Sequence, residues 1–410
     1  MYNKIYKKFF SQSHISISFF GTLLGVVTSV ILFLYSTKNN QELVIAKFSI
    51  FLLIFFGTSI ICMVGNDLEI LAKTKMINKK IIIIDNRVFK LIISLLLNVL
   101  LFKIYNHYKN IFVIEISTYD LLIIHIAIFI NNINKTFQSY IQSSSKLFAN
   151  SLIDLSRYSG YFFFLITWIL NLVNELSVIF IFGEILAILS LFFYFILNFS
   201  NIYFVKDNSK FDTRYIFQSI SQFSYQGLFK IDILTLSIIG NARLVIMYAI
   251  LSNVIEGIVN FITTFHPSMN NFIIKNKQNI IKKQDINNYF SINKIADLLI
   301  ILILPAYLIF NYLIFFKMPE ISFFLIVCIL AISIFISKKL FLFYFIFSLY
   351  EKPFTQLFFS IFFLSTNLIL NIIFYKNIGI IGIALATSFS YLLFNTIIIR
   401  ELKNKKFKLN

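Results

Sequence analysis

About twelve apolar stretches, each long enough to cross a bilayer, follow one another along the chain with only short polar breaks between them. A spanning helix needs about 20 mostly apolar residues, because the hydrocarbon core is roughly 30 Å thick. Lipid cannot hydrogen-bond open strand edges, and a membrane β-barrel would alternate polar and apolar residues over about ten positions. We therefore predict an all-α polytopic membrane protein with helices at 15–35, 43–64, 81–102, 111–131, 151–173, 177–198, 216–240, 244–267, 295–316, 321–346, 356–375 and 379–399.

The distribution of positive charge predicts how the chain is oriented. Charged residues make up only 13% of the 410 residues, well below the roughly 25% of a soluble domain. With a cytoplasmic amino terminus, 25 of the 36 Lys and Arg residues fall in cytoplasmic segments, 6 fall on the opposite side and 5 fall within or at the edge of spans. Membrane proteins carry this excess on the cytoplasmic side. We expect both termini in the cytoplasm, and we attribute the +18 charge to this asymmetry rather than to a nucleic-acid partner.

The polar breaks divide the chain into two halves. The longest breaks are 132–150, 199–214 and 268–294, and the second leaves six predicted spans on each side. We expect an N-terminal six-helix bundle over 1–198, a central cytoplasmic linker over 199–214, and a C-terminal six-helix bundle over 215–410 with a basic cytoplasmic tail. We interpret 132–150 as an amphipathic extension of its neighbouring helices. Two six-helix halves are typical of many secondary transporters, which bind substrate near the bilayer midplane.

Ionisable side chains inside the predicted spans are the first candidates for functional residues. Each costs about 2.5 to 3.5 kcal/mol on insertion scales, so such a side chain usually faces a cavity or a partner. The acidic positions are Asp85, Asp154, Glu184, Asp232, Glu256 and Asp297, and the basic positions are Arg87, Lys90, Arg157 and Lys230.

Helical spacing separates two of these pairs. Asp154 and Arg157 are three residues apart on one helical face, where they would neutralise each other. Alternatively, Arg157 offers its planar guanidinium to a phosphate, for which Arg is well shaped. Lys230 and Asp232 are two apart and project about 200° apart around a helix, so at least one of them meets another helix or water.

Five other positions have a structural interpretation beside a functional one. Arg87 and Lys90 share a face near a cytoplasmic end, where long basic side chains reach the interface by snorkelling. His125 is either a hydrogen-bonded packing residue or a proton relay. Pro267 and Pro305 each remove a helix hydrogen bond and permit a kink, which is common in membrane helices and would also serve a moving helix.

The sequence has no motif of a catalytic or cofactor site. It contains no G-x-x-x-x-G-K-[ST] phosphate loop, no D-x-D, no H-E-x-x-H and no C-x-x-C. Cys62 and Cys328 both lie in apolar segments, which favours small buried side chains over a disulfide framework. No polar insertion is long enough for a separate soluble domain. We expect a protein that is not an enzyme and has no cofactor.

Two segments resemble the polysaccharide-transport branch of the MOP flippase superfamily. Segment 227–269 is similar to the seventh and eighth helices of that family, and its matching positions are Lys230, Asp232, Tyr248, Ala249 and Pro267. Segment 367–390 is similar to the last two helices, and its matching positions are Asn367, Asn371 and the run of small residues from Gly379 to Thr387. The first-helix signature of the family, an Arg before a Gly-Pro turn, is absent, and TKNNQELVIAKFS stands there instead.

The resemblance implies a Wzx-type flippase of the bacterial inner membrane. Such a protein moves undecaprenyl-diphosphate-linked repeat units, of the O-antigen of lipopolysaccharide or of capsule, to the outer leaflet by alternating access. Its cavity is typically cationic, and the candidates here for binding the diphosphate are Arg157, Lys230 and Arg87. The candidate cavity or ion-coupling acids are Asp154, Asp232, Glu256 and Asp297, with H⁺ or Na⁺ as the coupling ion. Other glycan-assembly membrane proteins would be its partners.

Two alternative functions compete with the flippase. A multidrug or cation-coupled exporter of the same superfamily would use acids such as Asp232 or Glu256 for ion coupling. A membrane glycan polymerase or ligase would usually present a sizeable outer loop, and every predicted outer loop here is short.

Overall fold

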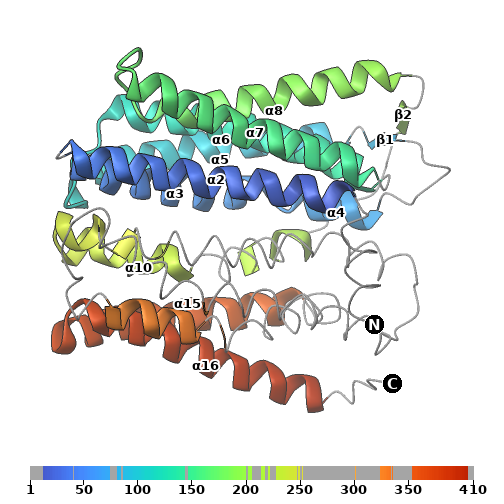
Figure 1. Ribbon diagram of the computed structural model, residues 1–410. Coiled ribbons are helices and arrows are strands. Elements are labelled where there is room, and N and C mark those ends of the chain that lie inside the picture. The colour runs from blue at the N-terminus through green and yellow to red at the C-terminus, as the bar shows by residue number, and fades with distance from the viewer. Residues whose placement is uncertain are drawn as a thin grey trace. The chain divides into compact units, whose positions relative to one another are not determined.

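The described residues are almost entirely helical and form two compact units (Figure 1). A computed structural model describes residues 13–39, 41–73, 81–84, 86–143, 146–199, 202–205, 214–217, 220–221, 228–246, 248–249, 252, 301, 324–333, 335 and 353–404. The N-terminal unit holds the described residues of 13–221 together with 236–246, and the C-terminal unit holds 228–235 and the described residues from 248 onward. The predicted linker over 199–214 stays a prediction, because few of its residues are described.

Helix α6 lies at the centre of the N-terminal unit. The helices of this unit are α2 (Ser13–Lys38), α3 (Glu42–Met63), α4 (Asn66–Lys73), α5 (Asn86–Tyr108), the short η1 (Lys109–Ile111), α6 (Thr118–Ser143), α7 (Leu147–Ile169) and α8 (Val178–Leu197). Helix α6 packs against α3, α4, α5, α7 and α8, while α7 packs against α2 as well. Polar side chains on α6 such as Asn132, Asn134 and Thr136 are therefore buried between helices.

Two of these helices end where the backbone enters the left-handed region. Helix α3 ends at Met63, and the next two residues, Val64 and Gly65, have φ angles of 53° and 67°. A Cβ on Gly65 would lie 2.2 Å from the carbonyl oxygen of Tyr215, so only glycine fits at this close approach. Helix α7 ends at Ile169, shortly before Asn171 with φ 57°, a conformation that Asn tolerates better than most residues.

A short parallel β-pair corrects two sequence predictions. Strand β1 (Ile81–Ile84) pairs with β2 (Ile202–Val205), with Ile81 opposite Ile202. The prediction of a helix over 81–102 is wrong at its start, and the fold is not strictly all-α. Four consecutive Ile residues account for the difference, because β-branched side chains favour the extended backbone.

Most helix positions in the described parts follow the prediction. Helices α2, α3 and α8 confirm the predicted spans 15–35, 43–64 and 177–198, as α15 and α16 do for 356–375 and 379–399. The span predicted at 111–131 is shifted, since α6 runs from Thr118 to Ser143. The predicted amphipathic extension over 132–150 is confirmed, because α6 ends and α7 begins inside that segment.

A tight helical hairpin forms much of the described C-terminal unit. Helix α15 (Pro353–Ile378) leads into α16 (Ile380–Asn404) through Gly379, whose φ is 69°. A Cβ on Gly382 would lie 2.3 Å from the carbonyl oxygen of Phe374, so the two helices approach closely, as small residues allow. The unit also includes the first residues of α10 (Leu228–Ile239) and a helical segment over 324–333. The predicted spans 244–267 and 295–316 lie mostly outside the described residues.

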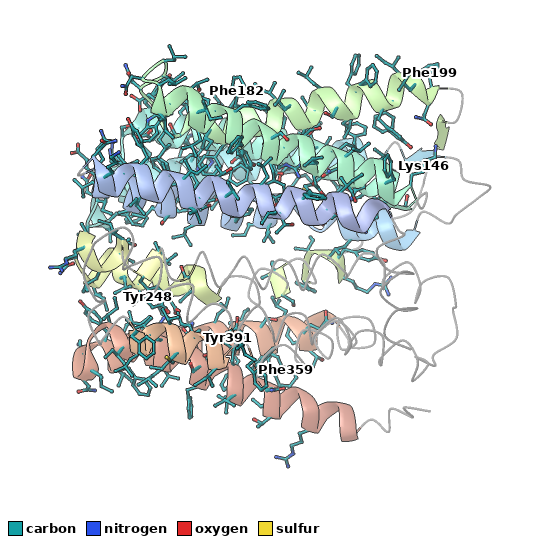
Figure 2. The ribbon with its side chains drawn as sticks, viewed as in Figure 1. Lys146, Phe182, Phe199, Tyr248, Phe359 and Tyr391 are labelled. Atoms are coloured by element: carbon teal, nitrogen blue, oxygen red, sulfur yellow. The ribbon has the colours of Figure 1, made fainter. Side chains whose placement is uncertain are left out.

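Apolar surface covers several helices. Among the described residues, five helices are long and apolar enough to cross a membrane, and their apolar segments are Leu43–Met63, Lys90–Ile111, Val178–Leu197, Phe354–Ile378 and Ile380–Ile397. Large side chains such as Leu96, Phe193 and Phe358 are more than half exposed, and Phe182 and Phe199 lie on the outer side of the N-terminal unit (Figure 2). Such faces are suited to lipid contact. The total of about twelve spans and the cytoplasmic termini stay predictions.

Candidate functional site

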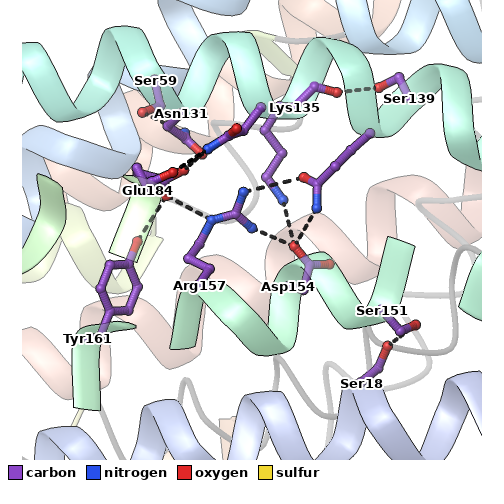
Figure 3. A network of polar contacts seen from close by, with 12 residues as sticks. Ser18, Ser59, Asn131, Lys135, Ser139, Ser151, Asp154, Arg157, Tyr161 and Glu184 are labelled. Atoms are coloured by element: carbon purple, nitrogen blue, oxygen red, sulfur yellow. Dashed lines mark hydrogen bonds and ion pairs between the residues drawn. The ribbon is translucent and has the colours of Figure 1, made fainter. Parts of the chain in front are cut away.

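A buried arginine in the N-terminal unit lies between two carboxylates. Arg157 on α7 donates from Nη1 to Oδ1 of Asp154 at 2.5 Å, and its Nε lies 2.7 Å from Oε1 of Glu184 on α8 (Figure 3). The predicted pairing of Asp154 with Arg157 is confirmed. The second partner, Glu184, was identified by sequence only as an ionisable residue inside a span.

Glu184 is held by three groups and by a close approach of helices. Its side chain is fully buried, and besides Arg157 it accepts hydrogen bonds from Nδ2 of Asn134 at 2.8 Å and from the hydroxyl of Tyr161 at 3.0 Å. Beside it, a Cβ on Gly160 of α7 would lie 2.7 Å from Cα of Gly183 on α8. This contact between the two helices brings Glu184 within reach of the guanidinium.

The other carboxylate, Asp154, is more accessible. Its Oδ1 also accepts a hydrogen bond from Nε2 of Gln138 at 3.0 Å and lies 3.6 Å from Nζ of Lys135, both on α6 (Figure 3). The side chains of Asp154 and Lys135 are 28% and 44% exposed, against 7% for Arg157. Lys135 lies within α6, in the segment that was predicted to extend the neighbouring helices. Two cations and two carboxylates thus balance one another at this site, which keeps any single buried charge from being uncompensated.

A second polar site lies in the C-terminal unit around Asp232. This carboxylate on α10 is fully buried. It accepts hydrogen bonds from the hydroxyls of Tyr248 at 2.5 Å and Thr387 at 2.6 Å, and from the amides of Asn371 at 2.8 Å and Asn367 at 3.3 Å. The sequence predicted that Asp232 or Lys230 meets another helix, and Asp232 meets both α15 and α16. Among the described residues, the donors that hydrogen-bond to Asp232 are all neutral.

The structure does not describe the side chains of the remaining candidates. Glu256, Asp297, Pro267 and Pro305 lie outside the described residues, as does Asp85. Arg87 and Lys230 lie on described helices, but their side chains are outside the described part. Within the described residues, no group of three or more His, Cys, Asp or Glu side chains is placed to hold a metal ion.

Two further predictions about single residues have clear outcomes. Lys90 does not reach the interface, since it is buried in an ion pair with Glu69 of α4. The snorkelling prediction for Lys90 is therefore wrong, because the short helix α4 places an acid beside it. His125 is a buried hydrogen-bonded residue, which fits the packing interpretation, and its Nδ1 donates to Oδ1 of Asn98 at 2.6 Å.

Comparison with known proteins identifies the fold. No known protein family and no curated protein matches the sequence. An outward-facing multidrug resistance MATE family transporter of the MOP superfamily matches over 96% of both chains, with 12% identity and a TM-score of 0.59. The chain has the fold of the MOP superfamily transporters. Together with its apolar helices, this fold makes it a multi-pass membrane protein.

Two more solved structures agree with this fold. One is a MOP superfamily transporter from Pyrococcus furiosus, for which reverse polarity of the binding pocket suggests a different function; it is 12% identical over 95% of both chains, with a TM-score of 0.59. The other is a MATE in complex with MaD5, 11% identical over 95% of this chain and 96% of that one, with a TM-score of 0.59. The predicted superfamily fold is confirmed, while the polysaccharide-transport branch stays a prediction.

Proposed function

We propose that this protein is a transporter that moves undecaprenyl-diphosphate-linked oligosaccharide repeat units, of O-antigen or capsule type, across the bacterial inner membrane by alternating access. The MOP superfamily fold supports the transport role. Segments 227–269 and 367–390, which resemble the polysaccharide-transport branch, support the choice of substrate. Other membrane proteins of glycan assembly would supply and receive the substrate.

The observation that carries the substrate proposal is the pair of cations inside an apolar helical unit. Arg157 and Lys135 come from adjacent helices, and both contact the same oxygen of Asp154. A cation within the bilayer is costly and usually marks a substrate pathway. A guanidinium and an ammonium together match the oxygens of a diphosphate. Lys230 and Arg87 are further candidates for the same role.

Asp232 is our proposed site of ion coupling. Its hydrogen-bond donors among the described residues are all neutral, and a buried carboxylate without a cationic partner tends to take up a proton or a cation. The hydroxyl and amide groups around Asp232 also carry oxygen atoms that suit Na⁺. Exchange of H⁺ or Na⁺ at this residue would favour one access state over the other. Asp154, Glu256 and Asp297 are further candidate acids.

A cation-coupled multidrug exporter is the second candidate function. The MATE description of the structural neighbours favours it, and so does the buried acid Asp232, which an exporter also needs for coupling. The two functions differ in the substrate, since an exported drug requires no paired cations at Arg157 and Lys135.

Complementation of a deletion strain tests the proposal and separates the two functions. We expect deletion to abolish surface glycan without drug hypersensitivity. The wild-type gene and Arg400→Ala, a change at an exposed arginine of α16, should restore the glycan, whereas Arg157→Ala should not. Protein levels of each variant in the membrane fraction control for misfolding. Drug hypersensitivity with intact surface glycan would instead favour the exporter.

A further inference from the structure

One oxygen of Asp154 gathers donors of three chemical kinds. The guanidinium of Arg157 lies 2.5 Å from Oδ1, the amide of Gln138 lies 3.0 Å from it, and the ammonium of Lys135 lies 3.6 Å from it (Figure 3). A guanidinium, an amide N–H and an ammonium are also the groups that bind a phosphate oxygen. Asp154 therefore occupies a position suited to an oxyanion.

The two carboxylates beside Arg157 differ in how firmly they are held. Glu184 is fully buried and has three partners, Arg157, Asn134 and Tyr161. It lies against Nε of the guanidinium, whereas Asp154 contacts Nη1. Asp154 is 28% exposed, so it can leave its position without opening the core of the unit. The accessible carboxylate, Asp154, thus contacts a terminal nitrogen of the guanidinium, whereas the buried carboxylate, Glu184, contacts its inner nitrogen Nε.

We propose that Asp154 is an exchangeable counter-ion, which the diphosphate of a lipid-linked substrate replaces on Arg157, Lys135 and Gln138. Glu184 is a positioning residue that keeps the guanidinium oriented during the exchange. This proposal rests on the proposed function. In this proposal Asp154 opposes substrate binding, whereas Arg157, Lys135 and Gln138 favour it.

Charge balance explains why a transporter would contain such a residue. Without Asp154, the cluster of Arg157, Lys135 and Glu184 has one net positive charge inside a helical unit, which is costly while the site is empty. Asp154 removes that excess in the empty site. An anion must then compete with the internal carboxylate, which lowers the apparent affinity and eases release after transport.

The exchange predicts that neutralising Asp154 tightens substrate binding. The test measures binding of geranyl diphosphate to the full chain in nanodiscs, for wild type, Asp154→Asn, Lys135→Gln and Glu175→Gln. A charge-assisted contact is worth about 1.5 to 3 kcal/mol, so we expect about tenfold tighter binding for Asp154→Asn and about tenfold weaker binding for Lys135→Gln. Glu175 is exposed, and Glu175→Gln controls for the loss of one negative charge.

The outcomes separate this inference from the proposed function. If the wild type binds geranyl diphosphate and Asp154→Asn binds it equally tightly or more weakly, the exchange is overturned and the proposed function stands. Binding by Asp154→Asn alone would support the exchange, because the internal carboxylate would then block the wild-type site. Absence of binding to both proteins would overturn both proposals. Inorganic diphosphate should bind with lower affinity, and it too should bind more tightly to Asp154→Asn than to the wild type. If inorganic diphosphate shows this difference and geranyl diphosphate does not, the assignment to a lipid-linked substrate is overturned.

Lys135→Gln keeps the test decisive if Asp154→Asn does not fold. Lys135 is 44% exposed, so its replacement leaves no buried group behind. Unchanged affinity in this variant would contradict a site that includes the ammonium.

Discussion

Thr387 donates a 2.6 Å hydrogen bond to Oδ2 of Asp232, a residue 155 positions earlier in the chain. Asn371 donates to the other oxygen of the same carboxylate at 2.8 Å. The last two helices of the chain therefore hold a buried acid of α10 by hydroxyl and amide groups. Any change in the charge of Asp232 is felt directly by α15 and α16, which is what ion coupling at this residue requires.

Asp232→Asn should abolish the dependence of transport on an ion gradient. Asparagine has nearly the same shape but cannot take up a proton and binds cations weakly, so the driving step is lost. We expect transport in proteoliposomes to fall more than about tenfold, as for loss of a charged group worth about 1.5 kcal/mol or more. Substrate binding in nanodiscs should change much less. Full gradient-driven transport by Asp232→Asn would exclude this residue as the coupling site.

Thr387→Val should weaken the apparent affinity for the coupling ion without abolishing transport. The change keeps the side-chain shape and removes a hydrogen bond worth about 1 kcal/mol, which is roughly a fivefold effect. Thr366 on α15 is the matched control, because its hydroxyl donates to the backbone oxygen of Phe362 in its own helix. Thr366→Val should leave ion activation unchanged, and equal effects of the two variants would argue against a specific role for Thr387.

Lys90→Met should destabilise the N-terminal unit. Lys90 and Glu69 form a buried ion pair, and removal of one partner from such a pair typically costs about 3 to 5 kcal/mol. Thermal unfolding in detergent should show a clear drop in melting temperature. The double variant Lys90→Met and Glu69→Met should regain much of the loss, because apolar pairs often replace buried ion pairs well. Lys103→Met, at an exposed lysine of the same helix, should melt like wild type.

Gly183→Ala should disturb both packing and the Arg157 site. A Cβ at this position would lie 1.9 Å from Cε1 of Tyr161, so the Tyr161 ring must shift. The shift removes the hydroxyl that donates to Glu184, and Glu184 in turn pairs with Arg157. Overpacking typically costs about 1 to 3 kcal/mol, so we expect a lower melting temperature. We also expect reduced surface glycan in the complementation assay. Wild-type behaviour in both assays would contradict the close contact between Gly183 and the Tyr161 ring.

Hydrophobic pattern was sufficient to predict most of the described helices but not where some of them begin. Segment 81–84 is as apolar as the helix that follows it, and its strand partner lies at 202–205, a pairing that local sequence cannot supply. The sequence predicted that the polar segment after Asn131 extends the neighbouring helices, but it did not predict what its side chains contact. Because α6 is surrounded by other helices, Asn134 and Gln138 find partners on α8 and α7.

The sequence predicted which ionisable residues form the candidate sites, but only in part which of them contact one another. Asp154 and Arg157 share a face of one helix, so their contact followed from spacing alone. Glu184 reaches Arg157 only because Gly160 and Gly183 bring α7 and α8 together, which requires knowledge of helix packing. The resembling segments included Asn371 and Thr387, but their common acceptor, Asp232, became evident only in the three-dimensional structure.

The most direct test of the proposed function is the membrane leaflet in which polyprenyl-diphosphate-linked repeat units accumulate when the protein is depleted from its host. We predict accumulation in the cytoplasmic leaflet together with loss of surface glycan. Accumulation of single repeat units in the outer leaflet would contradict the proposal, because translocation would then be intact. An unchanged pool in both leaflets would contradict it as well and would favour the exporter.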